Sequence, residues 1–122
     1  MSMPAGKYWV GDLCYVLGDR WDEFCDITCD NHDVLDGEFT LSDGTRFASY
    51  CTRHGDCQYS DQFGNQYGVD AGLIGCVLVD DIHEDEDNCL HGGHVYEFAY
   101  DFETRSTASG TIRIGEIKIK TG

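Results

Sequence analysis

The chain has 122 residues, and its 41% hydrophobic content excludes an intrinsically disordered chain. A chain of this length holds one hydrophobic core, so we expect a single domain over 1–122. The formal net charge is −15, with eight Lys and Arg against 23 Asp and Glu, which argues against nucleic acid or an anionic membrane surface as a partner.

The first part of the chain predicts a strand followed by a short helix. Segment 8–17 is rich in aromatic and β-branched residues and predicts a strand with a bulge or kink at Gly11-Asp12. From Trp21 to Thr28, apolar or small residues recur at i, i+3, i+4 and i+7, which predicts one helix over about 20–29. The stretch 1–6 precedes these elements, and we expect it to be flexible.

The remainder predicts strands joined by tight turns. Asp43-Gly44 is typical of a hairpin, and 61–64 suits a type I turn closed by glycine. The apolar run 73–79 predicts a fully buried strand, and 95–102 alternates as a half-buried strand with four aromatic residues on one face. We expect the isoleucines from 112 to 119 to lie on one strand whose phase is restored by a bulge at Gly115-Glu116.

About seven or eight strands and one short helix indicate a mostly β domain. Their close spacing favours a curled antiparallel sheet, a barrel or a sandwich. The stretch 80–94 is left as a long acidic loop. Exposed strand edges leave a homo-oligomer open as an alternative.

Seven cysteines and five histidines raise the question of a metal site. The chain starts without an apolar run behind its basic residue, so we expect a cytoplasmic protein with reduced thiols. Zinc prefers thiolate and imidazole ligands, and a structural site needs four of them. The candidate ligands are Cys25, Cys29, His32, Cys89, His91 and His94. Their spacing matches no familiar zinc motif, so the alternative is that Cys25 packs the helix face and the loop histidines are solvated.

Two further sets of residues are candidates for binding. Dense carboxylates attract a cation such as calcium or a basic protein, although such runs are usually solvated loops. This acidic set comprises Asp80, Asp81, Glu84, Asp85, Glu86 and Asp87. Tyrosines beside carboxylates can line a small-ligand pocket at the mouth of a β-barrel, or can simply belong to the core and turns. That second set comprises Asp12, Asp56, Asp70, Tyr59 and Tyr67.

Catalytic signatures are weak. The sequence contains no G-x-S-x-G, no phosphate-binding glycine loop ending in Lys-Ser/Thr and no H-E-x-x-H. Cys51 and His54 could form a nucleophile and base only if the chain bends between them. We therefore assign no catalytic residue, and the sequence leans away from an enzyme.

Three stretches carry a resemblance to other proteins: YWVGDLCY at 8–15, WDxF at 21–24 and GVDAGLIG at 68–75. They resemble a group of small uncharacterised proteins of bacteria and tailed phages, including phages of cyanobacteria. The resemblance covers most of 7–79 and involves glycine, aspartate and aromatic positions. It implies a viral origin and expression inside a bacterial host, and it supplies no activity.

These observations favour a non-enzymatic binding module that binds a basic host or viral protein through an acidic surface. The alternative is a small-ligand or metal-binding β domain. No cofactor is expected, with zinc and calcium as the ions to consider.

Overall fold

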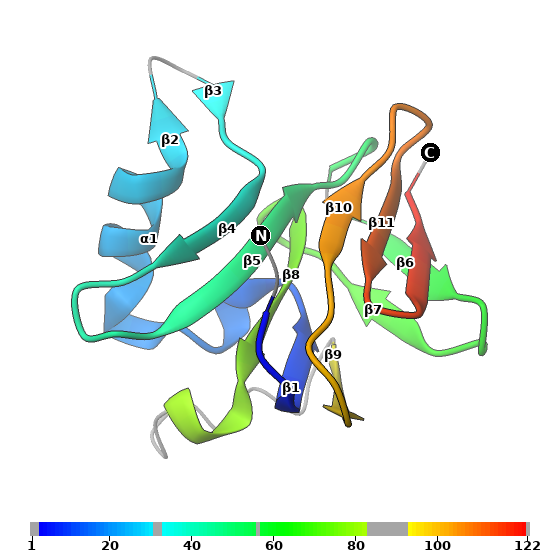
Figure 1. The fold of residues 1–122 in the computed structure, drawn as a ribbon. Helices are drawn as coiled ribbons and strands as arrows, with labels where there is room; N and C mark the ends of the chain where they lie inside the picture. The colour runs from blue at the N-terminus through cyan, green and yellow to red at the C-terminus, as the bar shows by residue number, and fades with distance from the viewer. Residues whose placement is uncertain (1–2, 31–32, 56, 83–92, 122) are drawn as a thin grey trace.

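Two five-stranded antiparallel sheets form most of the protein (Figure 1). A computed structural model describes residues 3–30, 33–55, 57–82 and 93–121. The predicted mostly β fold with one short helix is confirmed, as a sandwich-like arrangement of ten strands rather than seven or eight.

The first sheet has the strand order β4-β5-β8-β1-β9. Its strands are β1 (Gly6–Gly11), β4 (Gly37–Thr40), β5 (Arg46–Cys51), β8 (Leu73–Leu78) and β9 (Gly93–Phe98). The second sheet has the order β10-β11-β12-β6-β7. Its strands are β6 (Gln58–Asp61), β7 (Gln66–Gly68), β10 (Thr104–Ser106), β11 (Thr111–Ile114) and β12 (Ile117–Lys120).

The smaller elements lie between these strands. The helix α1 spans Trp21–Thr28, close to the predicted 20–29, and a two-stranded pair follows it, β2 (Cys29–Asp30) with β3 (Asp33–Val34). Short 3-10 helices span Leu13–Tyr15, Gly18–Arg20 and Val79–Asp81. Among the described residues, no helix is long and apolar enough to cross a membrane.

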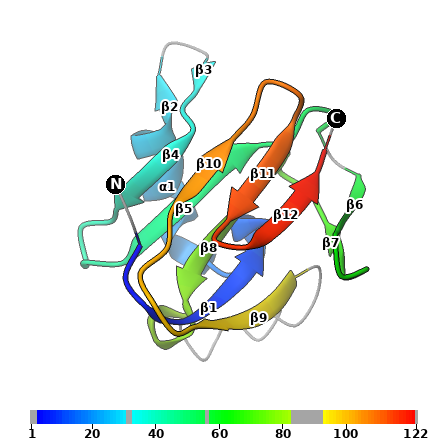
Figure 2. The ribbon, with the colours of Figure 1, turned by 45° about the vertical axis from the view of Figure 1, so that its right-hand side comes forward.

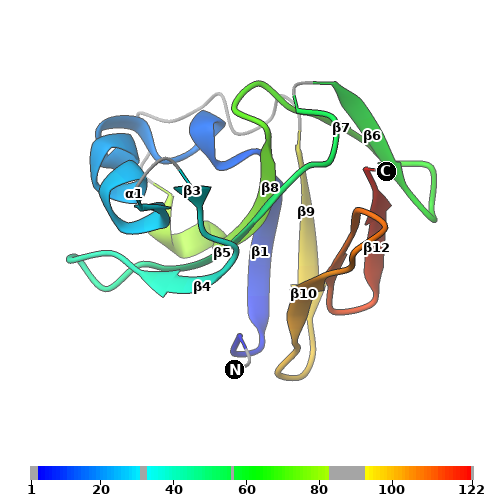
Figure 3. The ribbon, with the colours of Figure 1, turned by 90° about the horizontal axis from the view of Figure 1, so that it is seen from above.

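The first sheet is covered on both faces. The helix lies against one face and the second sheet against the other (Figure 3), with β10, β11 and β12 lying across β5, β8 and β1 in Figure 2. In β8, Ile74 and Cys76 point to the second sheet, whereas Leu73 and Val77 point to the helix. The continuous apolar run of this strand therefore follows from burial on both sides, as predicted.

Packing explains where the helix lies. Phe24 is buried, and its ring lies 5.1 Å from that of Phe47 on β5 and 4.6 Å from that of Trp21 (centroid to centroid). The Thr28 hydroxyl donates to the Phe24 carbonyl over 2.8 Å in the last turn. The helix is thus fixed to the sheet by aromatic contacts along its apolar face.

Two predicted hairpins are present. Strands β4 and β5 pair on either side of Asp43-Gly44, and Asp43 accepts from the Thr45 amide over 2.9 Å. Strands β6 and β7 pair around the turn 61–64, which Gly64 closes at a φ of +85°. Both turns thus follow from local sequence alone.

The C-terminal segment differs from the prediction. Residues 111–120 form a hairpin of two strands, not one bulged strand, because Gly115 adopts a φ of +58° and the chain reverses at Gly115-Glu116. The isoleucines do share one buried face, which comprises Ile112, Ile114, Ile117 and Ile119.

The predicted strand 95–102 ends early, at Phe98. The chain then bends, so Tyr100 is 83% exposed rather than on the aromatic inner face. Phe102 returns to the core and forms an isolated bridge with Met3. Met3 is fully buried and exchanges two backbone hydrogen bonds with Phe102, of 2.8 and 3.0 Å.

Candidate functional site

A groove of about 520 Å³ opens beside β9, and we call it the acidic groove. It lies between the end of β9, the bend that follows, the β6–β7 turn and the start of β12. Its lining combines aromatic and apolar side chains with three carboxylates: Phe63, Tyr96, Phe98, Tyr100, Phe102 and Ile117 with Glu97, Asp101 and Glu116. Within the described part of the chain, no Lys or Arg lines it.

The aromatic floor of the groove is held by the core. The rings of Phe98 and Phe102 stack at 3.9 Å between centroids with 20° between their planes. Tyr8 from β1 packs edge-on against both, at 5.8 and 5.0 Å. By contrast, Phe63 is 64% exposed and Tyr100 is 83% exposed. The groove therefore has a rigid floor with two solvated aromatic side chains beside it.

Gly115 shapes one wall of the groove. A Cβ at this position would lie 2.8 Å from Cε1 of Phe98, and the φ of +58° is itself unfavourable for other residues. Glycine thus lets the β11–β12 turn approach the aromatic floor. The following residue, Glu116, is exposed and lines the groove.

A buried carboxylate organises the adjacent wall. Asp61 is 7% exposed and accepts hydrogen bonds from the hydroxyls of Tyr67 and Tyr96, at 2.7 and 2.8 Å. Its other oxygen accepts from the amides of Phe63 and Asn65, at 2.8 and 3.0 Å. The network joins the β6–β7 turn of the second sheet to β9 of the first, and it fixes Tyr96 at the groove.

The pKa values in this network reflect its hydrogen bonds. Burial alone would raise the pKa of Asp61, but bonds from Tyr67, Tyr96 and two backbone amides outweigh it and lower that pKa below its ordinary value. Burial raises the pKa of Tyr67, and the bonds to Tyr96 and Asp61 raise it further. Asp61 is therefore a structural anion at neutral pH, with both tyrosines protonated.

Of the predicted residues Asp12 and Asp70, the carboxylate of the first contacts only the backbone amide of the second. The Asp12 carboxylate is fully buried and accepts from the amides of Cys14, Asp70 and Ala71, at 3.0, 2.9 and 2.6 Å. It thereby ties the end of β1 to the loop before β8. Its oxygens are used by backbone donors rather than turned toward a pocket.

The two predicted tyrosines have different surroundings. Tyr67 is in the Asp61 network, whereas the Tyr59 hydroxyl donates to the Gly55 carbonyl over 2.9 Å. Both rings are buried between the sheets. Tyr67 therefore supports the groove from below, because its hydroxyl oxygen lies 2.8 Å from that of Tyr96 and both hydroxyls share Asp61 as acceptor.

Part of the predicted acidic set can be placed. Asp80 and Asp81 lie in the 3-10 helix after β8, and Asp80 is exposed. The remaining predicted binding residues lie outside the described residues: Asp56, Glu84, Asp85, Glu86 and Asp87.

The predicted metal ligands are likewise only partly described. Cys25 is partly buried on α1, and His94 on β9 bonds the Gln66 carbonyl through Nε2 over 2.7 Å. Cys29 lies in β2, and Figure 3 shows α1 and β9 well apart. No three His, Cys, Asp or Glu side chains gather into a metal-binding group in the described ranges. His32, Cys89 and His91 lie outside them.

Two thiols are poor nucleophiles. Burial raises the pKa of Cys76 to about 12. Burial and a hydrogen bond with Asp12 raise the pKa of Cys14 to about 12. Because the thiolate is the reactive form, neither residue suits covalent catalysis at neutral pH.

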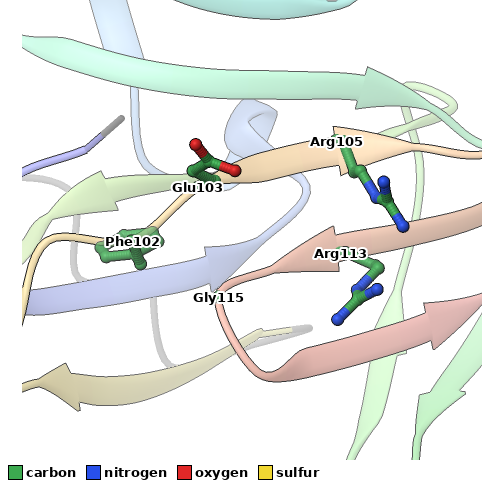
Figure 4. Close-up of a pocket in the computed structure, with 5 residues that line it drawn as sticks. All are labelled: Phe102, Glu103, Arg105, Arg113 and Gly115. Carbon is green, nitrogen blue, oxygen red and sulfur yellow. The ribbon is translucent and has the colours of Figure 1, made fainter. Parts of the chain in front are cut away.

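A second hollow, of about 400 Å³, adjoins the acidic groove and shares Phe102 and Gly115 with it. Two arginines, Arg105 and Arg113, dominate this hollow (Figure 4). The two hollows thus have opposite charge although they meet at the same turn.

No protein-family model, curated protein or solved structure matches this chain. Its functional interpretation therefore rests on the geometry and chemistry of these sites.

Proposed function

We propose that this protein is a non-enzymatic binding module that binds a basic segment of a partner protein in the acidic groove. One observation supports this most: exposed aromatic side chains stand beside three carboxylates and no cation in the described lining. Such a lining complements a segment in which Lys or Arg alternates with apolar residues.

Each part of the groove has a role in this proposal. The faces of Phe63 and Tyr100 accept cationic side chains through cation–π contacts or apolar ones through burial. Glu97 on β9 and Glu116 in the β11–β12 turn flank the floor and pair with Lys or Arg. The stacked Phe98 and Phe102 supply a preformed apolar surface, so little ordering is required on binding.

The charge of the whole chain supports the same partner. A net charge of −15 attracts basic proteins over long distances and speeds their encounter. The resemblance to bacterial and tailed-phage proteins makes host or viral proteins the first class in which to seek that partner.

The test is calorimetric titration with a short synthetic peptide of alternating Lys and Leu. We expect saturable binding that weakens as salt is raised, because charged contacts are screened. The double variant Glu97→Gln/Glu116→Gln should lose roughly five- to tenfold in affinity, since two exposed carboxylates that line the groove are removed.

The matched control is Asp22→Asn/Asp26→Asn, which removes two exposed carboxylates from α1, away from the groove. It changes net charge equally and should leave affinity nearly unchanged. Equal losses in the two double variants would show that diffuse charge, and not the groove, binds the peptide. A peptide with Ser in place of Leu should bind more weakly if the aromatic floor takes part.

A further inference from the structure

The outer face of the second sheet carries a row of cations, which we call the cationic face. Arg105 on β10 lies directly opposite Arg113 on β11, which in turn lies opposite Lys118 on β12. Lys120 lies two residues further along β12 and therefore on the same face. The neighbouring Ile112, Ile114, Ile117 and Ile119 are buried, which directs these four side chains outward.

This face concentrates charge of one sign. It holds four of the eight Lys and Arg residues of a chain that has 23 acidic residues. In the strands of this sheet, the one acidic residue is Asp61, which is buried on the inner side. Among the described residues, no carboxylate forms an ion pair with any of the four cations.

Like charges directly opposite on neighbouring strands repel and destabilise the pair. Arg105 and Arg113 are such a pair, and Figure 4 shows their guanidinium groups on the same side of the two strands, in a hollow that Glu103 also lines. An anion between the two guanidinium groups would replace this repulsion with attraction. The arrangement therefore favours an anionic ligand over an empty site.

The hollow at this pair fits a small molecule. Its volume of about 400 Å³ is in the usual range of ligand pockets, ~300–1,000 Å³. Two planar guanidinium groups offer paired donors that match the oxygens of a phosphate. A phosphate monoester carries close to two negative charges at neutral pH and has three oxygens, so it can use both arginines at once.

We propose that Arg105 and Arg113 bind the phosphate group of a small phosphate monoester, with Phe102 and Gly115 beside the rest of that ligand. A nucleic-acid strand suits the face less well, because the chain is strongly negative and the described residues place no aromatic side chain between these cations for base stacking. The proposal does not rest on the basic-peptide function proposed above, although the two hollows share Phe102 and Gly115.

The test is a titration of isotope-labelled protein with phenyl phosphate, followed by amide and arginine-side-chain NMR signals. We expect saturable shifts at Arg105, Arg113 and Gly115, and none with phenol at the same concentrations. Inorganic phosphate should bind the same residues more weakly, because it lacks the organic part that contacts Phe102. Equal binding of both probes would identify free phosphate as sufficient and would overturn the monoester assignment.

Single variants distinguish binding at the arginine pair from nonspecific attraction of phosphate to positive charge. Arg105→Gln or Arg113→Gln should weaken phenyl phosphate roughly tenfold or more, because a charge-assisted bidentate contact is lost. The control Lys7→Gln removes one exposed cation from β1 and should change the affinity little.

Thermal unfolding gives a second measurement that does not depend on NMR assignment. Phenyl phosphate should raise the Tm of the wild type and of Lys7→Gln, and at the same concentration should raise that of Arg113→Gln by clearly less. The proposal is overturned by the absence of shifts with phenyl phosphate, by equal losses in Arg113→Gln and Lys7→Gln, or by tighter binding of a single-stranded oligonucleotide to these residues.

Discussion

The two faces of the first sheet bury different kinds of side chain. Toward α1, the buried hydrophobic residues include no tyrosine in the described part of the chain: Trp9, Leu13, Val16, Leu17, Phe24, Leu41, Phe47, Leu73 and Val77. Toward the second sheet, four tyrosines are buried: Tyr8, Tyr50, Tyr59 and Tyr67. The face toward the second sheet thus carries four fully or nearly buried tyrosine hydroxyls that need partners, whereas Tyr15 on the helix side is only partly buried.

Those hydroxyls reach their partners at the margins of the sandwich. Tyr67 reaches Asp61 near β9, Tyr50 reaches Thr104 on β10, and Tyr8 reaches the Pro4 carbonyl. The inter-sheet layer therefore fixes how the two sheets meet, which in turn shapes both hollows. The helix-side layer stabilises the fold without touching either hollow, so stability and binding should respond to different substitutions.

The largest effect should come from Phe47→Ala on the helix side. Phe47 is fully buried between the rings of Phe24 and Phe39, and its loss should leave a cavity that costs about 3–5 kcal/mol of unfolding free energy. Urea unfolding measures this cost. Peptide affinity at the acidic groove should stay the same under conditions in which the variant is folded.

Phe63→Ala is the counterpart, with the same change at a residue that is 64% exposed. It should change the unfolding free energy by less than about 0.5 kcal/mol and should weaken the peptide. If Phe47→Ala weakened the peptide as much as Phe63→Ala, the separation between the two layers would be wrong.

An intermediate effect should come from Asp61→Asn in the inter-sheet layer. The substitution keeps one acceptor oxygen but removes a charge that accepts from Tyr67, Tyr96 and two amides, at a cost of about 1–3 kcal/mol near neutral pH. Since Tyr96 lines the groove, the peptide should also bind more weakly. The loss of stability and the weaker peptide binding should occur together, because both depend on the Asp61 network.

This cost should depend on pH in a defined direction. The folded-state pKa of Asp61 is lowered, so its contribution is complete above the unfolded pKa of about 3.9 and is lost as pH falls through the folded value. The difference in unfolding free energy between wild type and Asp61→Asn should therefore shrink below about pH 4. The control is Asp26→Asn, which replaces an exposed carboxylate on α1. If the difference between wild type and Asp61→Asn stayed constant with pH, the assignment of Asp61 as a structural anion would be contradicted.

Much of this fold could be predicted from short sequence patterns, because those elements are set by residues close together in the chain. The helix followed from apolar spacing between Trp21 and Thr28, and the hairpin at Asp43-Gly44 followed from turn chemistry. The hairpin at Gly115 was mistaken for a bulge, because a two-residue turn and a bulge both return the isoleucines to one face. The turn and the bulge differ in which residues pair across strands, and the sequence of one segment does not contain that information.

The candidate sites were harder to predict because they join distant segments. The acidic groove brings together Phe63, Tyr100 and Glu116, and the cationic face pairs Arg105 with Arg113 across two strands. In the sequence the basic residues look scattered, although the alternation Ile117-Lys118-Ile119-Lys120 already placed two of them on one outward face. The missing information was which strands are neighbours.

Within the inter-sheet layer, a smaller effect than that of Asp61→Asn should come from Tyr50→Phe, at the edge of the sandwich away from Asp61. The Tyr50 hydroxyl lies 2.7 Å from the Thr104 hydroxyl oxygen, which itself donates to Glu38 over 2.9 Å. The substitution removes one neutral hydrogen bond while Thr104 keeps its bond to Glu38, so the cost should be about 0.5–1.5 kcal/mol. Urea unfolding against Tyr100→Phe, which changes an exposed hydroxyl, isolates that bond. A cost equal to that of Asp61→Asn would mean that the hydroxyl contact at the β10 edge joins the sheets as strongly as the Asp61 network beside β9.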